Sequence, residues 1–110
     1  MPVFQDFYVI EDCDFYLRID RPDADGEMRV SDGEAVAYLD EGIARDFACF
    51  IEQQLLSPIL DCLILEADDL SIKVSSSGTG IRLFTGEECY LDADQARELV
   101  KFITASLDDL

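Results

Sequence analysis

The sequence predicts an α+β fold made of two tandem ββββα units, and three observations support this fold class. One set of residues returns in the same order 52 residues later, which indicates an internal repeat. Each copy contains segments in which apolar and polar residues alternate, as they do in half-buried strands. Each copy then ends in an amphipathic segment typical of a helix. We therefore expect a pseudo-two-fold single domain with an antiparallel sheet and both helices on one face of it.

The repeat is clearest between residues 38–55 and 90–107. Two copies are fewer than the roughly three that a solenoid needs to bury its faces. Units of about 50 residues are also marginal alone, so copies 1–57 and 58–110 are expected to share one core in a single domain spanning 1–110. The identical residues are Tyr38-Leu39-Asp40, Ala44-Arg45, Phe50-Ile51 and Leu55, which return as Tyr90-Leu91-Asp92, Ala96-Arg97, Phe102-Ile103 and Leu107.

Each copy is expected to begin with two strands. The first copy opens with an apolar run at 7–10, and a short acidic turn separates this run from an alternating segment at 15–19. The second copy repeats the arrangement with an apolar run at 62–65 and an alternating segment at 70–74. Every second residue of the alternating segments is apolar, which predicts strands with one buried face.

A hairpin is expected next in each copy. Asp32-Gly33 and Thr85-Gly86 are typical of tight two-residue turns, because glycine adopts the positive backbone φ that such turns demand. The segments that follow, Tyr38-Leu39 and Tyr90-Leu91, are either short edge strands or extended entries to the helices. Each copy is therefore expected to be a meander of four strands.

A helix is expected after each meander. Asp40 and Asp92 precede the helical segments and can accept hydrogen bonds from free amides of the first turn, and Gln95 completes a capping-box pattern with Asp92. Ser57-Pro58 is expected to end the first helix. The apolar stripes that predict a buried face are Ile43, Phe47, Phe50, Ile51 and Leu55 in the first copy and Ala96, Leu99, Val100, Ile103 and Leu107 in the second.

The chain is strongly acidic, with 25 Asp and Glu residues, 8 Lys and Arg residues and a formal net charge of −17. The excess is spread over both copies. A field of this sign disfavours nucleic acids and anionic membranes and favours basic partners. The expected partner is a basic protein, and neither direct nucleic-acid binding nor membrane binding is expected.

Most of the few basic residues occupy equivalent positions in the two copies. Opposite charges stabilise each other across strands and along helices, so these residues are expected to pair with nearby acids rather than to form a binding patch. Only Arg21 and Lys101 have no counterpart in the other copy. The related residues are Arg18 and Lys73, Arg29 and Arg82, and Arg45 and Arg97.

Acidic residues at the predicted turns are the candidate partner-binding residues. The first turn of each copy is acidic, whereas the acids at 23–27 occur in the first copy only. We expect the loop at 20–27 to make the most specific contact, the alternative being that loop drift alone accounts for its acids. Substitutions in this exposed loop are expected to leave stability nearly unchanged. The candidate residues are Asp23, Asp25 and Glu27 in this loop, Asp12 and Asp14 in the first turn of copy one, and Asp68 and Asp69 in copy two.

No residue pattern predicts a cofactor, a metal site or catalysis. The chain has no His to activate a Ser or Cys nucleophile or to complete a mixed zinc site. Segment 23–27 has the composition of a calcium loop, but an EF-hand register around Gly26 places Arg21 at the first ligand position, so an acidic turn is expected instead. The cysteines lack metal-binding spacing and are expected to be reduced core residues. They are Cys13, Cys49, Cys62 and Cys89.

These features predict a non-catalytic, acidic binding protein. It is expected in the cytoplasm, since no apolar run approaches the roughly 18 residues of a membrane span. Rows of carboxylates can compete with DNA for basic residues, so the expected partner surface is the nucleic-acid groove of a nuclease, toxin or DNA-binding protein. Immunity, anti-restriction and other DNA-mimic inhibitors act in this way. The alternatives are an acidic secretion-type chaperone and a domain whose acidity is an adaptation to high salt.

Overall fold

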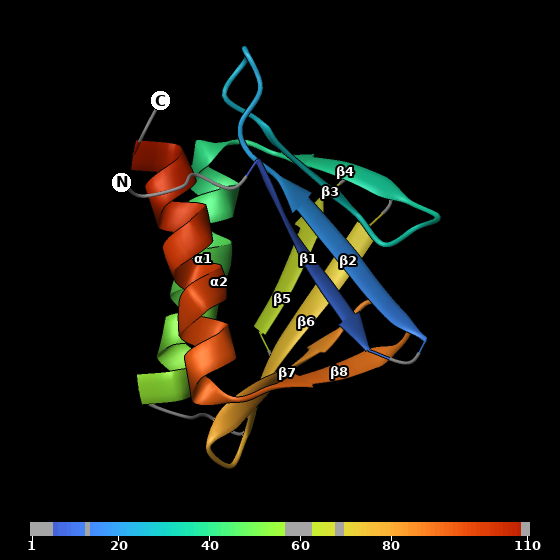
Figure 1. Ribbon diagram of the computed structural model, residues 1–110, viewed down its shortest axis with the longest axis vertical. Helices are drawn as coiled ribbons and strands as arrows, with labels where there is room; N and C mark the ends of the chain where they lie inside the picture. The colour runs from blue at the N-terminus through green and yellow to red at the C-terminus, as the bar shows by residue number, and fades with distance from the viewer. Residues whose placement is uncertain (1–5, 13, 57–62, 68–69, 109–110) are drawn as a thin grey trace.

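The computed structural model describes residues 6–12, 14–56, 63–67 and 70–108. It contains two four-stranded antiparallel sheets, each followed by one helix (Figure 1), which confirms the predicted α+β class and the tandem ββββα order. The described strands form two separate sheets rather than one. The elements are β1 (Phe7–Asp12), β2 (Phe15–Asp20), β3 (Met28–Ser31), β4 (Val36–Leu39), α1 (Glu41–Leu56), β5 (Leu63–Ala67), β6 (Leu70–Ser77), β7 (Gly80–Phe84), β8 (Glu88–Leu91) and α2 (Ala93–Asp108).

The two sheets have the same topology and corresponding registers. Their strands lie in the orders β1-β2-β3-β4 and β5-β6-β7-β8, so each is a meander as predicted. Successive side chains of a strand point to opposite faces of the sheet, and one face of each sheet is buried. Every second residue of β2 and of the first part of β6 lies in the core. The corresponding cross-strand pairs include Ile10 with Leu17 and Leu65 with Ile72, and Arg29 with Tyr38 and Arg82 with Tyr90.

The hairpin turns between the last two strands of each copy are wider than predicted. The strand pairing leaves residues 32–35 in the first turn and 85–87 in the second, so the expectation of two-residue turns is wrong. In the first turn the Oδ1 atom of Asp32 accepts hydrogen bonds from the two backbone amides after Gly33, at 2.9 and 2.7 Å, and thereby stabilises the longer loop. Gly33 and Gly86 have φ values of 97° and 113°, as the sequence predicts.

The predicted helix caps are present. The Oδ1 atoms of Asp40 and Asp92 each accept a hydrogen bond from the backbone N–H three residues later, at 2.8 Å. The Oε1 atom of Gln95 accepts from the backbone N–H of Asp92 at 3.1 Å, which completes the capping box. Helix α1 ends at Leu56, and the Ser-Pro stop expected after it lies outside the described residues.

The buried face of α2 includes the whole predicted stripe, but the face of α1 is rotated from the prediction. Ile43, Phe50 and Leu55 are only half-buried, because two alanines and Gln54 occupy part of the face that is turned to the core. Gln54 is also buried, and its Nε2 atom donates a hydrogen bond to the backbone oxygen of Val74 in β6 at 3.4 Å. The buried residues of α1 are Ala44, Phe47, Ala48, Ile51 and Gln54.

The helices form one layer beside the sheets and pack antiparallel to each other (Figure 1). The start of α1 meets the end of α2, where Arg45 forms an ion pair with Asp108. Helix α1 packs against strands of the second sheet, and the ring of Phe102 in α2 lies 5.6 Å from the ring of Tyr8 in β1. Each helix therefore reaches the sheet of the other copy, and the buried residues of both copies form one hydrophobic cluster.

Repeat-related residues occupy similar environments, as the pseudo-two-fold arrangement predicts. The leucines that end β4 and β8 are buried, as are the isoleucines on the core faces of the two helices. The related phenylalanines of α1 and α2 are both half-buried against the core. These pairs are Leu39 and Leu91, Ile51 and Ile103, and Phe50 and Phe102.

Gly80 begins β7 at a place where the backbone that leads into α2 passes close to it. A Cβ atom added at Gly80 would collide with the carbonyl oxygen of Leu91 and press against Asp92. Backbone atoms in a paired strand cannot move aside without shifting the start of α2. We therefore predict that Gly80→Ala lowers the free energy of unfolding by about 2 kcal/mol or more. Urea denaturation followed by circular dichroism measures this change.

Gly42→Ala is the matched control. Gly42 lies in the first turn of α1, and an added Cβ atom would have its nearest contact, at 3.4 Å, with the carboxylate of Asp40. Because alanine favours a helix over glycine by about 1 kcal/mol, this variant should be at least as stable as the natural protein. Equal effects of the two substitutions would contradict the close backbone approach at Gly80.

Candidate functional site

The structure places the predicted acidic residues at separate positions. Three of them share the loop between β2 and β3, whereas the two acids around the first turn line different pockets. The residues of the β2–β3 loop are Asp23, Asp25 and Glu27, and those around the first turn are Asp12 and Asp14. Asp68 and Asp69 lie outside the described residues, so their part of the prediction stays a prediction.

The acidic loop, residues 21–27, projects beyond the sheets at the top of Figure 1. Its three carboxylates gather closely, with oxygen atoms of Asp23, Asp25 and Glu27 all within 4.8 Å of one another. The Oδ1 atom of Asp23 accepts hydrogen bonds from the backbone N–H groups of Asp25 at 2.9 Å and Glu27 at 3.1 Å. Gly26, with a φ of 81°, closes the turn by donating to the backbone oxygen of Asp23 at 3.0 Å.

The acidic loop can accept hydrogen bonds from cationic groups of a partner. Asp23 and Asp25 are exposed and Glu27 is half-buried, so the three residues are accessible from solvent to different degrees. Calcium takes about six to eight oxygen ligands, and the three carboxylates supply only part of such a set. We therefore retain the interpretation as an acidic turn whose chemistry suits Lys and Arg side chains.

A second acidic surface surrounds a pocket of about 280 Å³ between three connections of the sheets, which we call the axial pocket. It brings Asp14 from the β1–β2 turn together with acids of the β3–β4 and β7–β8 turns. No Lys or Arg is found among the described residues that line it. Like charges around one pocket repel each other, and a cation between them relieves the repulsion. The lining residues are Asp14, Tyr16, Asp32, Glu34, Thr85, Gly86 and Glu87.

The repeat explains why the two copies contribute together to the axial pocket. Asp32 and Thr85 hold equivalent positions in the two hairpin turns, and both line this pocket and a neighbouring one that contains Lys73. The equivalent turns therefore meet next to the pseudo-two-fold axis. Glu34 and Glu87, which follow the two turn glycines, are both exposed and are brought to the same pocket.

Sequence reasoning selected Asp14 but missed Asp32, Glu34 and Glu87. The signal was present, because the repeat aligns Gly33-Glu34 with Gly86-Glu87. Its meaning depends on the rotation between the copies, since only a two-fold axis near these turns brings the glutamates of both to one place. The position of the axis follows from the packing of the two units and cannot be read from the pattern of either one.

Asp12 lies apart from Asp14 and lines a pocket with Cys89. Burial, and then the charge of Asp12, raise the pKa of the Cys89 thiol, so the thiol stays protonated and is a poor nucleophile. The prediction of core cysteines is confirmed for Cys89 and wrong for Cys49, which is exposed because its position on α1 faces away from the core. Cys13 and Cys62 lie outside the described residues.

The repeat-related arginines pair with nearby acids, as the sequence predicts. These pairs lie at the surface, where water and salt screen the attraction between the charges, so they contribute little to stability. For Lys73 no ion pair is found within the described part of the chain. None of the pairs involves an acid of the axial pocket, so the negative charge there is not neutralised by these arginines. The pairs are Arg18 with Asp20 (2.9 Å), Arg29 with Asp20 (3.4 Å), Arg45 with Glu41 (2.9 Å) and Asp108 (3.1 Å), Arg82 with Glu88 (3.4 Å) and Arg97 with Asp94 (3.5 Å).

Comparison of the sequence with protein-family models finds no match, and comparison with curated proteins finds none either. Within the described residues, neither helix combines the length and the apolar composition that crossing a membrane requires. The acidic loop and the axial pocket are therefore the surfaces whose chemistry and geometry bear on function. Both surfaces present carboxylates of several residues.

Asp23 is expected to stabilise the acidic loop, whereas the sequence alone predicts that substitutions in this loop leave stability nearly unchanged. Asp23→Ala removes the acceptor of two backbone N–H groups and should lower the free energy of unfolding by about 1 kcal/mol. Asp23→Asn keeps a side-chain oxygen and should retain most of the stability. Asp25→Ala is the control, because no hydrogen bond from a described residue ends on its carboxylate. Urea denaturation compares the three, and equal stability of the two alanine variants would contradict this role.

Proposed function

We propose that the protein is a non-catalytic binding protein whose acidic surface occupies a basic surface of a protein partner. The axial pocket receives a Lys or Arg side chain, and the acidic loop makes a second contact. The observation that carries this proposal is the convergence of carboxylates from both copies on one pocket that no described basic residue lines. Asp12, Asp68 and Asp69 remain candidate contacts of the same partner in this proposal.

The chemistry of the axial pocket suits a guanidinium or ammonium group. Carboxylates accept charge-assisted hydrogen bonds from these groups, and Arg can bind a carboxylate through two parallel bonds. Tyr16 and Thr85 also line the pocket, and hydroxyl groups can accept hydrogen bonds. A bound cation would also lower the mutual repulsion of Asp14, Glu34 and Glu87. Relief of this repulsion, which is present in the free protein, adds to the favourable free energy of binding.

The net charge of the whole chain supports the same class of partner. A charge of −17 on 110 residues attracts a basic surface over distances of about a Debye length and raises the association rate. A partner that binds nucleic acid presents closely spaced basic residues, so we propose a nuclease, a toxin or a DNA-binding protein as its class. Adaptation to high salt accounts for acids spread over a surface, whereas it offers no reason for carboxylates of both copies to share one pocket.

A decalysine peptide tests the proposal by isothermal titration calorimetry at about 50 and 200 mM salt. We predict that the natural protein binds this probe and that affinity falls as salt rises, because salt screens exposed charge pairs. The double variant Glu34→Lys/Glu87→Lys should weaken binding roughly tenfold or more, since it replaces two repeat-related acids of the axial pocket by bases. Asp25→Lys/Glu27→Lys measures the contribution of the acidic loop in the same assay.

Asp46→Lys/Glu98→Lys is the matched control. These two exposed acids are also related by the repeat, lie on the helices and change the net charge by the same amount. Under the proposal this variant weakens binding of the peptide much less than the axial-pocket variant. Equal losses would show that only net charge matters and would contradict a binding role of the pocket. Circular dichroism of each variant establishes that it is folded.

A further inference from the structure

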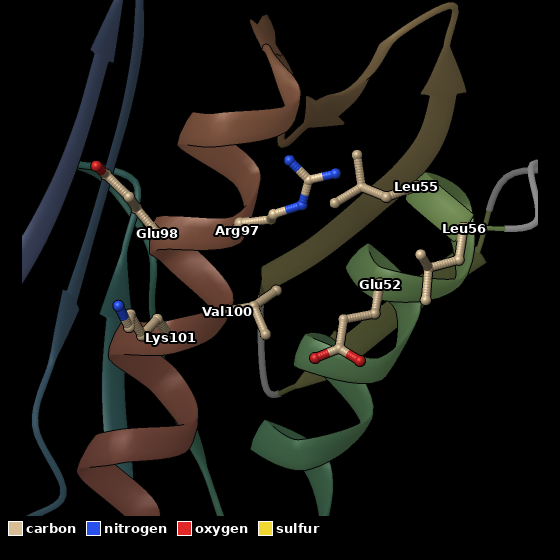
Figure 2. A pocket seen from close by; sticks show the side chains of 7 residues that line it. All are labelled: Glu52, Leu55, Leu56, Arg97, Glu98, Val100 and Lys101. Atoms are coloured by element: carbon tan, nitrogen blue, oxygen red, sulfur yellow. The ribbon is translucent and has the colours of Figure 1, made fainter.

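A groove of about 460 Å³ lies between the end of α1 and the first half of α2 (Figure 2). Its floor and walls are mainly aliphatic, with Leu55 and Leu56 on one side and Val100 on the other. Leu56 is 79% exposed, more than any other large apolar residue that the structure describes. Figure 2 shows Arg97 extending from α2 toward Leu55. Glu98 and Lys101 also line the groove, where their opposite charges offset each other, and Figure 2 shows them extending from the other side of α2.

The repeat provides an internal comparison, because the opposite end of the helix pair contains the equivalent positions. There Arg45 takes the place of Arg97, and Asp108 takes the place of Leu56. The Nη2 atom of Arg45 lies 3.1 Å from a carboxylate oxygen of Asp108, so an acid of one helix pairs with a base of the other. Leu107, just before this acid, is 2% exposed. The last turn of α2 therefore closes its end of the pair.

The groove lacks both of these closing contacts. Leu55, the counterpart of Leu107, is only half-buried, and Leu56 offers no carboxylate to Arg97. Among the described residues Arg97 pairs with Asp94 of its own helix, at 3.5 Å, and with no acid of α1. An aliphatic surface and a guanidinium group are thus exposed side by side, in a protein whose net charge is strongly negative.

We propose that the groove binds a segment of a protein partner that presents a leucine-type side chain followed by a carboxylate. The aliphatic side chain would cover Leu55, Leu56 and Val100, and the carboxylate would pair with Arg97 as Asp108 pairs with Arg45. Charge complementarity selects this occupant, because burial of apolar surface beside an arginine favours an acidic group over a basic one. Glu52 on the α1 side disfavours a second carboxylate there and so sets the orientation of the segment.

This inference goes beyond the proposed function, since the groove takes an acidic segment and lies on the helix layer. The turns that form the axial pocket connect strands on the other side of the core (Figure 1). The two surfaces can therefore act separately, and substitutions in one are expected to leave binding at the other unchanged.

A synthetic peptide with the sequence of residues 100–110 is the probe, because it carries the Leu-Asp pair that closes the other end of the helix pair. Fluorescence anisotropy of the labelled peptide measures its binding to the full chain. We expect saturable binding, which weakens roughly fivefold to tenfold when asparagine replaces both Asp108 and Asp109 in the peptide. Arg97→Ala should weaken binding by a similar factor. Leu56→Ser, at an exposed position, should also weaken binding.

Arg29→Ala is the matched control, because it removes one exposed arginine that pairs with Asp20 on the first sheet. It should bind the peptide as the natural protein does, and so should Glu34→Lys/Glu87→Lys. Absence of saturable binding, including the case in which the chain itself covers the groove, would overturn the proposal. Equal binding by Arg97→Ala and the natural protein would overturn it as well, and neither result would affect the decalysine experiment.

Discussion

Sharing of one apolar core by the two ββββα units is the constraint on which the rest of the structure depends. Neither unit buries its helix against its own sheet alone. The amide of Gln54 in α1 reaches the backbone of Val74 in the second sheet, and Phe102 in α2 packs against Tyr8 in the first. This reciprocal packing orients the units about a pseudo-two-fold axis and leaves the acids in turns and on outer faces, where water and salt screen their repulsion.

The two candidate surfaces arise from the repeat in opposite ways. In the axial pocket the copies agree, because equivalent hairpin turns bring Glu34 and Glu87 to one place. At the two ends of the helix pair the copies differ. Asp108 forms an ion pair with Arg45 at one end, whereas Leu56 holds the equivalent position at the other end and is exposed. The acidic loop is a further difference, as the second sheet closes the corresponding connection with the short turn at Gly78-Thr79. A duplicated fold can thus keep its core while its surfaces acquire different chemistry.

Much of the fold could be predicted from the sequence, because alternation, caps and helix stripes are local signals. The capping box at Asp92 and the strand at 15–19 are examples. Turn lengths escaped prediction, since the Asp32 side chain stabilises a wider loop than its Asp-Gly pair suggests. The burial of Gln54 and the convergence on the axial pocket depend on how the units dock, and no residue pattern within one unit records that geometry.

We propose above all that cationic side chains bind where the hairpin turns of the two copies meet. Nuclear magnetic resonance of the ¹⁵N-labelled protein, titrated with N-acetyl-lysine amide and N-acetyl-arginine amide at low salt, tests it at single residues. The account predicts that the largest amide shift changes fall at Tyr16, Glu34, Gly86 and Glu87, with saturation at a common ligand concentration. Changes of similar size over all exposed acids, or changes confined to the helices, would contradict a specific site at the axis.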